Sequence, residues 1–219
     1  MEEVGKEGFS EEEKWVRFYE KLEYLVEEVG EQLKKRFDFQ KQALAKQFPT
    51  VMKYLWRGGS ELTPEDAIEK VINQSTLAVG FIGLAECLLA LMGKHHGECD
   101  KAQTKGLEII TFMRDKCNEL KERYQLNYSL LATPAESLCK RFPKLDRERF
   151  GEVAGINTRE YYTNSNHVPV WHPISAVKKM ANEAPYHALT LGGHISYIEF
   201  DGNASENWQA IEKMVLMAH

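Results

Sequence analysis

The segment that decides the fold is Thr76–Met92, with the sequence TLAVGFIGLAECLLALM. Its first part, Thr76–Ile82, is apolar and partly β-branched, which predicts a buried strand. Its second part, Leu84–Met92, predicts an apolar helix, and the glycine that follows it, Gly93, is a common helix terminator. A strand that leads directly into a helix is typical of α/β proteins, in which helices connect parallel strands.

Strand and helix signals continue to alternate outward from this segment. Ala102–Tyr124 has apolar residues on one side and predicts an amphipathic helix. The short apolar stretch Asn127–Ala132 (NYSLLA) predicts a second strand, after which Thr133 is expected to open another helix. This alternation predicts an α/β fold with crossover helices.

The N-terminal part of the chain predicts one long helix. Ser10 followed by Glu13 forms the pattern of a capping box, in which each side chain bonds to the other residue's backbone N–H. Apolar residues then recur every three or four positions. They are Trp15, Phe18, Leu22, Leu25, Val29, Leu33 and Phe37. Such a stripe is typical of a helix packed against a core.

Shorter signals predict the remaining elements. Val51–Trp56 is expected to be a short strand, and Thr63 is expected to cap a helix that begins at the following proline. Phe142–Pro173 predicts a long irregular segment, and loops of this length are often functional. The alternating sequence His194–Phe200 predicts a strand, and Asn203–Glu206 is expected to start the last helix.

Composition excludes several classes of protein. The 219 residues are 43% hydrophobic and 28% charged with a net charge of −5, which disfavours disorder and general nucleic-acid binding. The apolar run is too interrupted by glycine and glutamate to span a membrane, and the acidic N-terminus lacks the apolar core of a signal peptide. The four cysteines lie too far apart for a typical zinc or disulfide pattern. We therefore expect a cytoplasmic protein with reduced thiols that binds neither membrane nor nucleic acid.

The turn after the second predicted strand is a candidate anion site. A strand that leads directly into a helix places free backbone N–H groups and the positive end of the helix dipole at the sheet edge where ligands usually bind. The first turn of this helix is expected to contain Thr133, Pro134 and Ser137; the wider set Ala132, Thr133, Pro134, Ala135, Glu136 and Ser137 comes from the family resemblance described below. An alternative remains open, because Thr133 and Glu136 also have the spacing of a capping box, which satisfies a helix without any ligand.

The histidines and cysteines give weaker signals. His95-His96-Gly97-Glu98-Cys99 contains three kinds of metal ligand, but adjacent histidines on a helix point in different directions and rarely hold one ion. A polar loop between helices is therefore the favoured interpretation, and no metal ligand is predicted. A nucleophilic pair of one cysteine and one histidine stays open, because nothing in the spacing shows which residues would meet.

Several long motifs together resemble one enzyme family, the anaerobic (class III) ribonucleoside-triphosphate reductases, which are glycyl-radical enzymes. The resemblance extends from about Glu11 to Met217. The motifs are GFIGLAE (Gly80–Glu86), GKHHGE (Gly93–Glu98), NYSLLATPAESL (Asn127–Leu138), REYYTNSNHVPV (Arg159–Val170) and EAPYHALTLGGHISYIE (Glu183–Glu199).

The resemblance implies a ten-stranded α/β barrel and a radical mechanism. In this family an activating enzyme with an iron–sulfur cluster and S-adenosylmethionine places a radical on a glycine, from which it passes to a cysteine inside the barrel. The resulting thiyl takes the ribose 3′ hydrogen and the 2′ hydroxyl leaves as water. The complete enzymes also carry a C-terminal zinc module.

This sequence contains only part of the family's pattern. It has no Arg-x-x-Gly-Tyr segment for the radical glycine, no paired cysteines of the zinc module, and no cysteine matched to the thiyl position. We therefore expect an acidic tail at residues 1–10 and a partial catalytic barrel at residues 11–219, inactive alone and binding no cofactor. Two alternatives stay open: a non-catalytic nucleotide-binding or structural fragment, and one polypeptide of a split enzyme.

The resemblance also implies a site and partners. The ATPAE turn, Ala132–Ser137 here, resembles the family's loop for substrate phosphates, and Asn164, Ser165 and His167 belong to a second motif in the active-site region. No catalytic residue is expected in this chain. The expected partners are a ribonucleoside triphosphate, the radical S-adenosylmethionine activating enzyme, and either the missing barrel segments or further copies of the chain.

Overall fold

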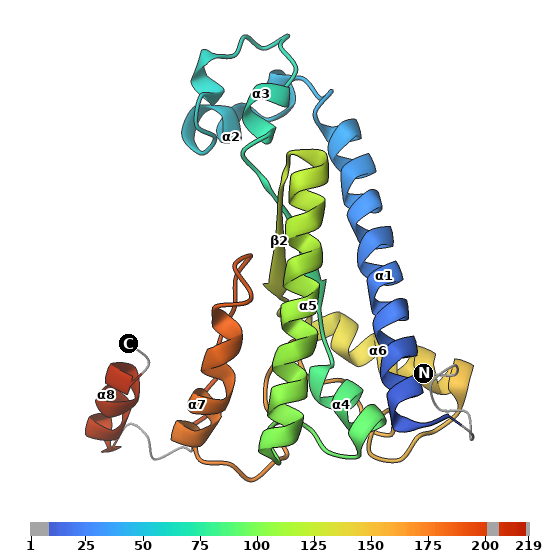
Figure 1. Ribbon diagram of the computed structural model, residues 1–219. Helices are drawn as coiled ribbons and strands as arrows, with labels where there is room; N and C mark the ends of the chain where they lie inside the picture. Colours follow the sequence, from blue (N-terminus) through green and yellow to red (C-terminus); the bar gives the residue numbers. More distant parts are fainter. Residues whose placement is uncertain (1–8, 201–205, 218–219) are drawn as a thin grey trace.

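The computed structural model describes residues 9–200 and 206–217 (Figure 1). Its centre is a two-stranded parallel sheet made of β1 (Thr76–Phe81) and β2 (Asn127–Ala132). Two long helices, α1 (Glu11–Gln40) and α5 (Asp100–Tyr124), run side by side next to the sheet, and α5 packs directly on β2. This arrangement confirms both predicted strands and the predicted α/β character of the chain.

The sheet has one buried face. The register pairs Thr76 with Asn127 at one end and Phe81 with Ala132 at the other. Apolar side chains of both strands alternate onto the buried face, as expected for strands covered by helices. They are Leu77, Val79, Tyr128, Leu130 and Ala132.

The connection between the strands contains two helices, as a parallel pair requires. The first is α4 (Leu84–Met92), whose predicted end is confirmed, since Gly93 adopts a left-handed φ of 72° and its N–H donates to the Leu89 carbonyl. The second is α5. After β2 the chain forms α6 (Glu136–Phe150), α7 (Ala176–His187) and α8 (Trp208–Met217).

The cap predicted for α1 is present. Ser10 Oγ accepts the Glu13 N–H at 3.2 Å, and the Ser10 N–H donates to Glu13 Oε2 at 2.8 Å. The middle of the helix approaches α5 closely at Gly30, where a Cβ atom would overlap the side chain of Leu120. The Tyr128 hydroxyl of β2 also donates to the Gly30 carbonyl at 2.8 Å. Gly30 therefore allows the close packing of α1, α5 and β2.

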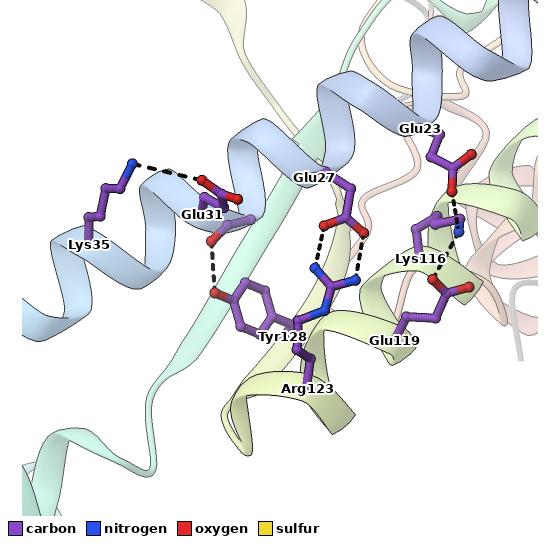
Figure 2. A network of polar contacts seen from close by, with 9 residues as sticks. Glu23, Glu27, Glu31, Lys35, Lys116, Glu119, Arg123 and Tyr128 are labelled. Carbon is purple, nitrogen blue, oxygen red and sulfur yellow. Dashed lines mark hydrogen bonds and ion pairs between the residues drawn. The ribbon is translucent and has the colours of Figure 1, made fainter.

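Charged side chains join α1 and α5 along the solvent-exposed side of this contact (Figure 2). Arg123 donates two hydrogen bonds to Glu27. Lys116 lies 2.6 Å from Glu23 on α1 and 2.9 Å from Glu119 on its own helix. Because these groups are partly exposed, each pair adds little free energy, and the apolar stripe holds the helices together.

Two predictions for residues 49–75 are wrong. Val51–Trp56 is not a strand, because Pro49 starts the short helix α2 (Pro49–Tyr54) with a backbone angle that suits a first helical position. Thr63 does not cap a helix. Its N–H donates to Asp66 Oδ2 at 2.7 Å and closes a turn, and only α3 (Glu69–Ile72) follows. One short 3-10 helix, Ala45–Gln47, precedes this region, and another, Gly59–Glu61, lies within it.

Predictions for the last third were partly wrong. The segment Phe142–Pro173 begins inside α6, which continues through Pro143 to Phe150, so its irregular part begins at Gly151. His194–Phe200 is not a strand, and within the described ranges the pairing beside it is one parallel bridge between Gly193 and Leu131. The predicted helix start at residues 203–206 lies largely outside the described residues.

The ten-stranded barrel is not visible in the described part of the chain, which forms the single sheet of β1 and β2. None of the helices in the described ranges is both long and apolar enough to cross a membrane.

A test of the packing between α5 and α7 is Gly106→Ala. Alanine favours a helix by about 1 kcal/mol, but a Cβ at this position overlaps the hydroxyl of Tyr186, which is fully buried. Overpacking of a core costs about 1–3 kcal/mol, so we expect a net loss of about 1 kcal/mol in the free energy of unfolding. Chemical denaturation measures it.

The matched control is the same substitution in a Tyr186→Phe background, which lacks the overlapping oxygen. There Gly106→Ala should cost much less or stabilise the protein. An equal cost in both backgrounds would contradict this account of the packing.

Candidate functional site

The candidate site lies where β1 and β2 end. β1 leads into α4 and β2 leads into α6, so the parallel pairing brings the beginnings of the two helices to the same edge of the sheet. A loop from the irregular segment, Tyr162–Asn166, bonds to both helix beginnings. Ligands of α/β proteins usually bind at this edge of the sheet.

Thr133 is not the cap of α6, so the predicted capping box is wrong. The helix begins at Glu136 after Ala135, which provides no side-chain cap, and the Thr133 hydroxyl donates to the Leu131 carbonyl at 3.3 Å. Pro134 stands between Thr133 and the helix and keeps the residue before it extended. Thr133 therefore lies in the extended connection between β2 and α6.

Asn164 binds the residue just before α6 and leaves the first turn of the helix uncapped. Its Oδ1 accepts the Ala135 N–H at 2.9 Å and the Cys139 thiol at 3.0 Å. The next three N–H groups, those of Glu136, Ser137 and Leu138, have no acceptor within the described part of the chain. Because these residues are exposed, the first turn of α6 can offer these N–H groups to an anion.

The loop that carries Asn164 is fixed by α4. The Thr163 N–H and hydroxyl both donate to Glu86 Oε1, at 3.0 and 2.7 Å. In return, the N–H of Gly83 donates to the Thr163 carbonyl at 2.8 Å, and that of Leu84 donates to Ser165 at 3.2 Å. Ser165 has a φ of 37°, a value that non-glycine residues seldom adopt.

The loop also binds to α6 at a backbone carbonyl that Pro143 leaves without a helical partner. Proline has no N–H, so the carbonyl of Cys139 lacks its usual partner one turn later in the helix. The Tyr162 N–H donates to that carbonyl at 2.9 Å. The Tyr162 hydroxyl also donates to Asp146 at 2.6 Å. The proline inside α6 therefore creates a docking point for the loop.

A buried carboxylate supports the far end of the loop. Glu183 of α7 is fully buried, and its Oε1 accepts the Val168 N–H at 2.9 Å and lies 2.6 Å from Lys179 Nζ. Its Oε2 lies 3.4 Å from His167 Nδ1. Burial raises the pKa of Glu183, but the bonds to His167 and Lys179 outweigh it and lower that pKa overall. The lowered pKa favours the ionised carboxylate, which lies beside Lys179 and His167.

The loop and the first turn of α6 border a cavity of about 510 Å³, a volume within the usual range for small-molecule sites. The lining comes from α6, the 160–174 loop, α7 and residues 197–199. Asn164 and His167 line the cavity, Ser165 does not, and of the predicted turn Ala132–Ser137 only Glu136 does. The structure thus brings the two predicted motifs together through Asn164, with the cavity beside the first turn of α6.

His96 and the Cys139 thiol have surroundings that suit structural roles. His96 is buried, its Nε2 lies 3.0 Å from the Asn166 carbonyl, and burial lowers its pKa to about 4. Burial raises the pKa of the Cys139 thiol to about 11, which disfavours a nucleophilic thiolate. Within the described ranges, no group of three or more His, Cys, Asp or Glu side chains is placed to hold a metal ion.

Sequence reasoning missed the residues that hold the site together. Glu86, Thr163, Cys139 and Glu183 were not singled out. One signal was available, because Glu86 is a carboxylate inside an otherwise apolar helix sequence, and such a residue needs a buried partner.

The contact between β1 and the turn can be tested with Gly80→Ala. A Cβ at Gly80 would overlap the hydroxyl oxygen of Thr133, so the substitution should displace the turn and cost about 1 kcal/mol in the free energy of unfolding. In a Thr133→Ala background the overlap is gone, and the substitution should be neutral or slightly stabilising. Thr133→Ala alone should cost less than about 0.5 kcal/mol, because Thr133 is no cap. A loss of about 1 kcal/mol from Thr133→Ala would restore the capping interpretation.

Comparisons with known proteins agree with this architecture. A family model for anaerobic ribonucleoside-triphosphate reductase matches residues 8–219. The proteins of that name from phage T4 and Escherichia coli K12 are 40% identical over 143 residues and 34% identical over 157. These matches cover 64% and 70% of this chain, and 22% of the length of each relative.

A solved structure shows the same fold. The anaerobic ribonucleotide reductase from Thermotoga maritima, crystallised with MES in its active site, superposes with a TM-score of 0.59 at 17% identity. The superposition covers 95% of this chain and 33% of that one. The chain belongs to the anaerobic ribonucleoside-triphosphate reductase family, and it spans about 22% of the length of its curated relatives.

Proposed function

We propose that this chain contributes the substrate phosphate-binding turn of an anaerobic ribonucleoside-triphosphate reductase, which makes deoxyribonucleotides. The observation that carries the proposal is the first turn of α6, which lies at the carboxyl edge of a parallel sheet and has three N–H groups without an acceptor among the described residues. These groups and the helix dipole suit a phosphate. Family membership makes a nucleoside triphosphate the natural source of that phosphate.

The proposed roles of individual residues follow from the contacts. The N–H groups of Glu136 and Ser137 bind phosphate oxygens, Thr133 and Pro134 shape the approach, and Ala135 is held by Asn164. His167 faces the adjacent cavity, with its ring fixed by Glu183. These side chains bind and orient a ligand, and none is assigned a bond-breaking step.

The radical step is proposed to need groups that this chain does not carry. In a complete reductase the glycyl radical would generate the cysteine thiyl that takes the ribose 3′ hydrogen. The described residues fit no zinc site, so no step is assigned to a metal here. The activating enzyme is a proposed partner of the complete reductase. The two outer edges of the small sheet are proposed to pair with further barrel strands or with a second copy of the chain.

Phosphate binding can be tested by removing the one carboxylate in the turn. Glu136 is exposed and repels an anion that binds to the N–H groups beside it. We expect weak, millimolar binding of inorganic phosphate, and Glu136→Gln should strengthen it roughly two- to fivefold. Amide shifts of Glu136, Ser137 and Leu138 in NMR titrations measure the affinity.

The matched control is Glu148→Gln, the same change of charge near the other end of α6. It should leave phosphate affinity within about twofold of the parent value. Equal effects of the two variants would show a nonspecific charge effect, and unresponsive amides in all three proteins would refute the phosphate site.

Turnover has its own test. We expect that the purified chain, incubated anaerobically with the activating enzyme and S-adenosylmethionine, gives no protein radical, because its sequence has no Arg-x-x-Gly-Tyr segment. Electron paramagnetic resonance and an assay for deoxynucleotides measure this. A glycyl-type doublet with product formation would contradict it.

A further inference from the structure

We infer that Glu86 is a positioning residue for the phosphate turn: through Thr163 and Asn164 it sets where α6 begins. This inference rests on the proposed function for its ligand, and on hydrogen bonds alone for its geometry. Glu86 belongs to α4, a different helix from the turn it positions, and it does not line the cavity.

The first step is the pair of hydrogen bonds that Glu86 accepts from the loop. Only 5% of Glu86 is exposed, and one of its oxygens, Oε1, accepts both the N–H and the hydroxyl of Thr163. Two bonds from one residue to one buried oxygen fix both the position and the rotation of Thr163. The Gly83 N–H holds the opposite side of the same peptide segment through the Thr163 carbonyl.

The second step is that the position of Thr163 determines, through Asn164, where α6 begins. Asn164 directly follows Thr163, and its Oδ1 accepts the Ala135 N–H at 2.9 Å. Ala135 is the residue immediately before the helix, so its N–H sets where the neighbouring free N–H groups lie. A shift of Thr163 therefore moves the binding groups, although Thr163 and Glu86 are proposed to touch no phosphate.

The third step is that Glu86 is poorly suited to a purely structural role. Burial raises its pKa, and its second oxygen, Oε2, is buried and has no hydrogen-bond partner in the part of the chain that the structure describes. An apolar residue would fill the space between α4 and the loop without that desolvation cost. The carboxylate contributes what an apolar residue lacks, an acceptor for two donors of Thr163.

The test compares Glu86→Ala, Glu86→Gln and Thr163→Val in the 219-residue chain. Glutamine keeps the carbonyl-type acceptor but buries an amide without a partner, so Glu86→Gln should lose stability and still bind phosphate within about twofold of the parent. Glu86→Ala removes the acceptor and should weaken phosphate binding roughly tenfold. Thr163→Val loses only the hydroxyl bond, and its phosphate affinity should lie between those of Glu86→Gln and Glu86→Ala.

Two readouts separate positioning from general stability. The Ala135 amide resonance, measured without ligand, should move in Glu86→Ala and Thr163→Val and stay in place in Glu86→Gln. The control Ile110→Val creates a small cavity at a fully buried position of α5 and should lower the unfolding midpoint with no change in either the Ala135 resonance or phosphate binding.

Each outcome decides one of the two ideas. If phosphate does not shift the amide resonances of Glu136, Ser137 and Leu138 in the parent chain, the proposed function fails. The Ala135 resonance measured without ligand still tests the positioning role of Glu86. If Thr163→Val leaves Ala135 and phosphate binding unchanged, or Ile110→Val weakens binding as much as Glu86→Ala does, the positioning role of Glu86 is wrong. If Glu86→Ala does not fold, Thr163→Val and Glu86→Gln still give this decision.

Discussion

The parallel pairing of β1 with β2 is the constraint on which the described structure depends. Parallel strands need a long crossover, and here α4 and α5 provide it. The same pairing places the beginnings of α4 and α6 side by side, because each helix follows the carboxyl end of its strand. The candidate site is thus a direct consequence of strand direction, before any individual side chain is considered.

The loop across these helix beginnings is held mainly by polar contacts. Glu86, Asn164 and Glu183 each accept hydrogen bonds from backbone groups, and Glu86 and Glu183 are almost fully buried. Removing one partner from a buried pair leaves an unsatisfied group, which costs more than the bond itself contributed. The loop should therefore tolerate changes in its apolar contacts better than changes in these acceptors.

The sequence predicted the regular core well, because that core follows simple periodic rules. The long helix α1 and the strands Thr76–Phe81 and Asn127–Ala132 are confirmed. The stripe predicted on that helix is confirmed only in part, because Leu25 and Val29 are exposed and Val26 is buried. Predictions failed where one local bond decided the outcome. Asp66 closed a turn at Thr63, and Asn164, 29 residues away along the chain, replaced Thr133 as the partner of the α6 beginning. No local pattern shows such a distant partner, so a capping box was the reasonable prediction.

The use of Asn164 as a substitute cap has a consequence for affinity. It occupies the Ala135 N–H, and Glu136 places a negative charge in the turn, so the turn alone offers few donors and an opposing carboxylate. A free helix beginning attracts an exposed anion by only about 0.3–1 kcal/mol. A triphosphate held at this turn therefore needs additional cationic or hydrogen-bonding groups. Lys140 borders the adjoining cavity and can serve that purpose, whereas Lys179 and His167 in the same lining lie against the carboxylate of Glu183.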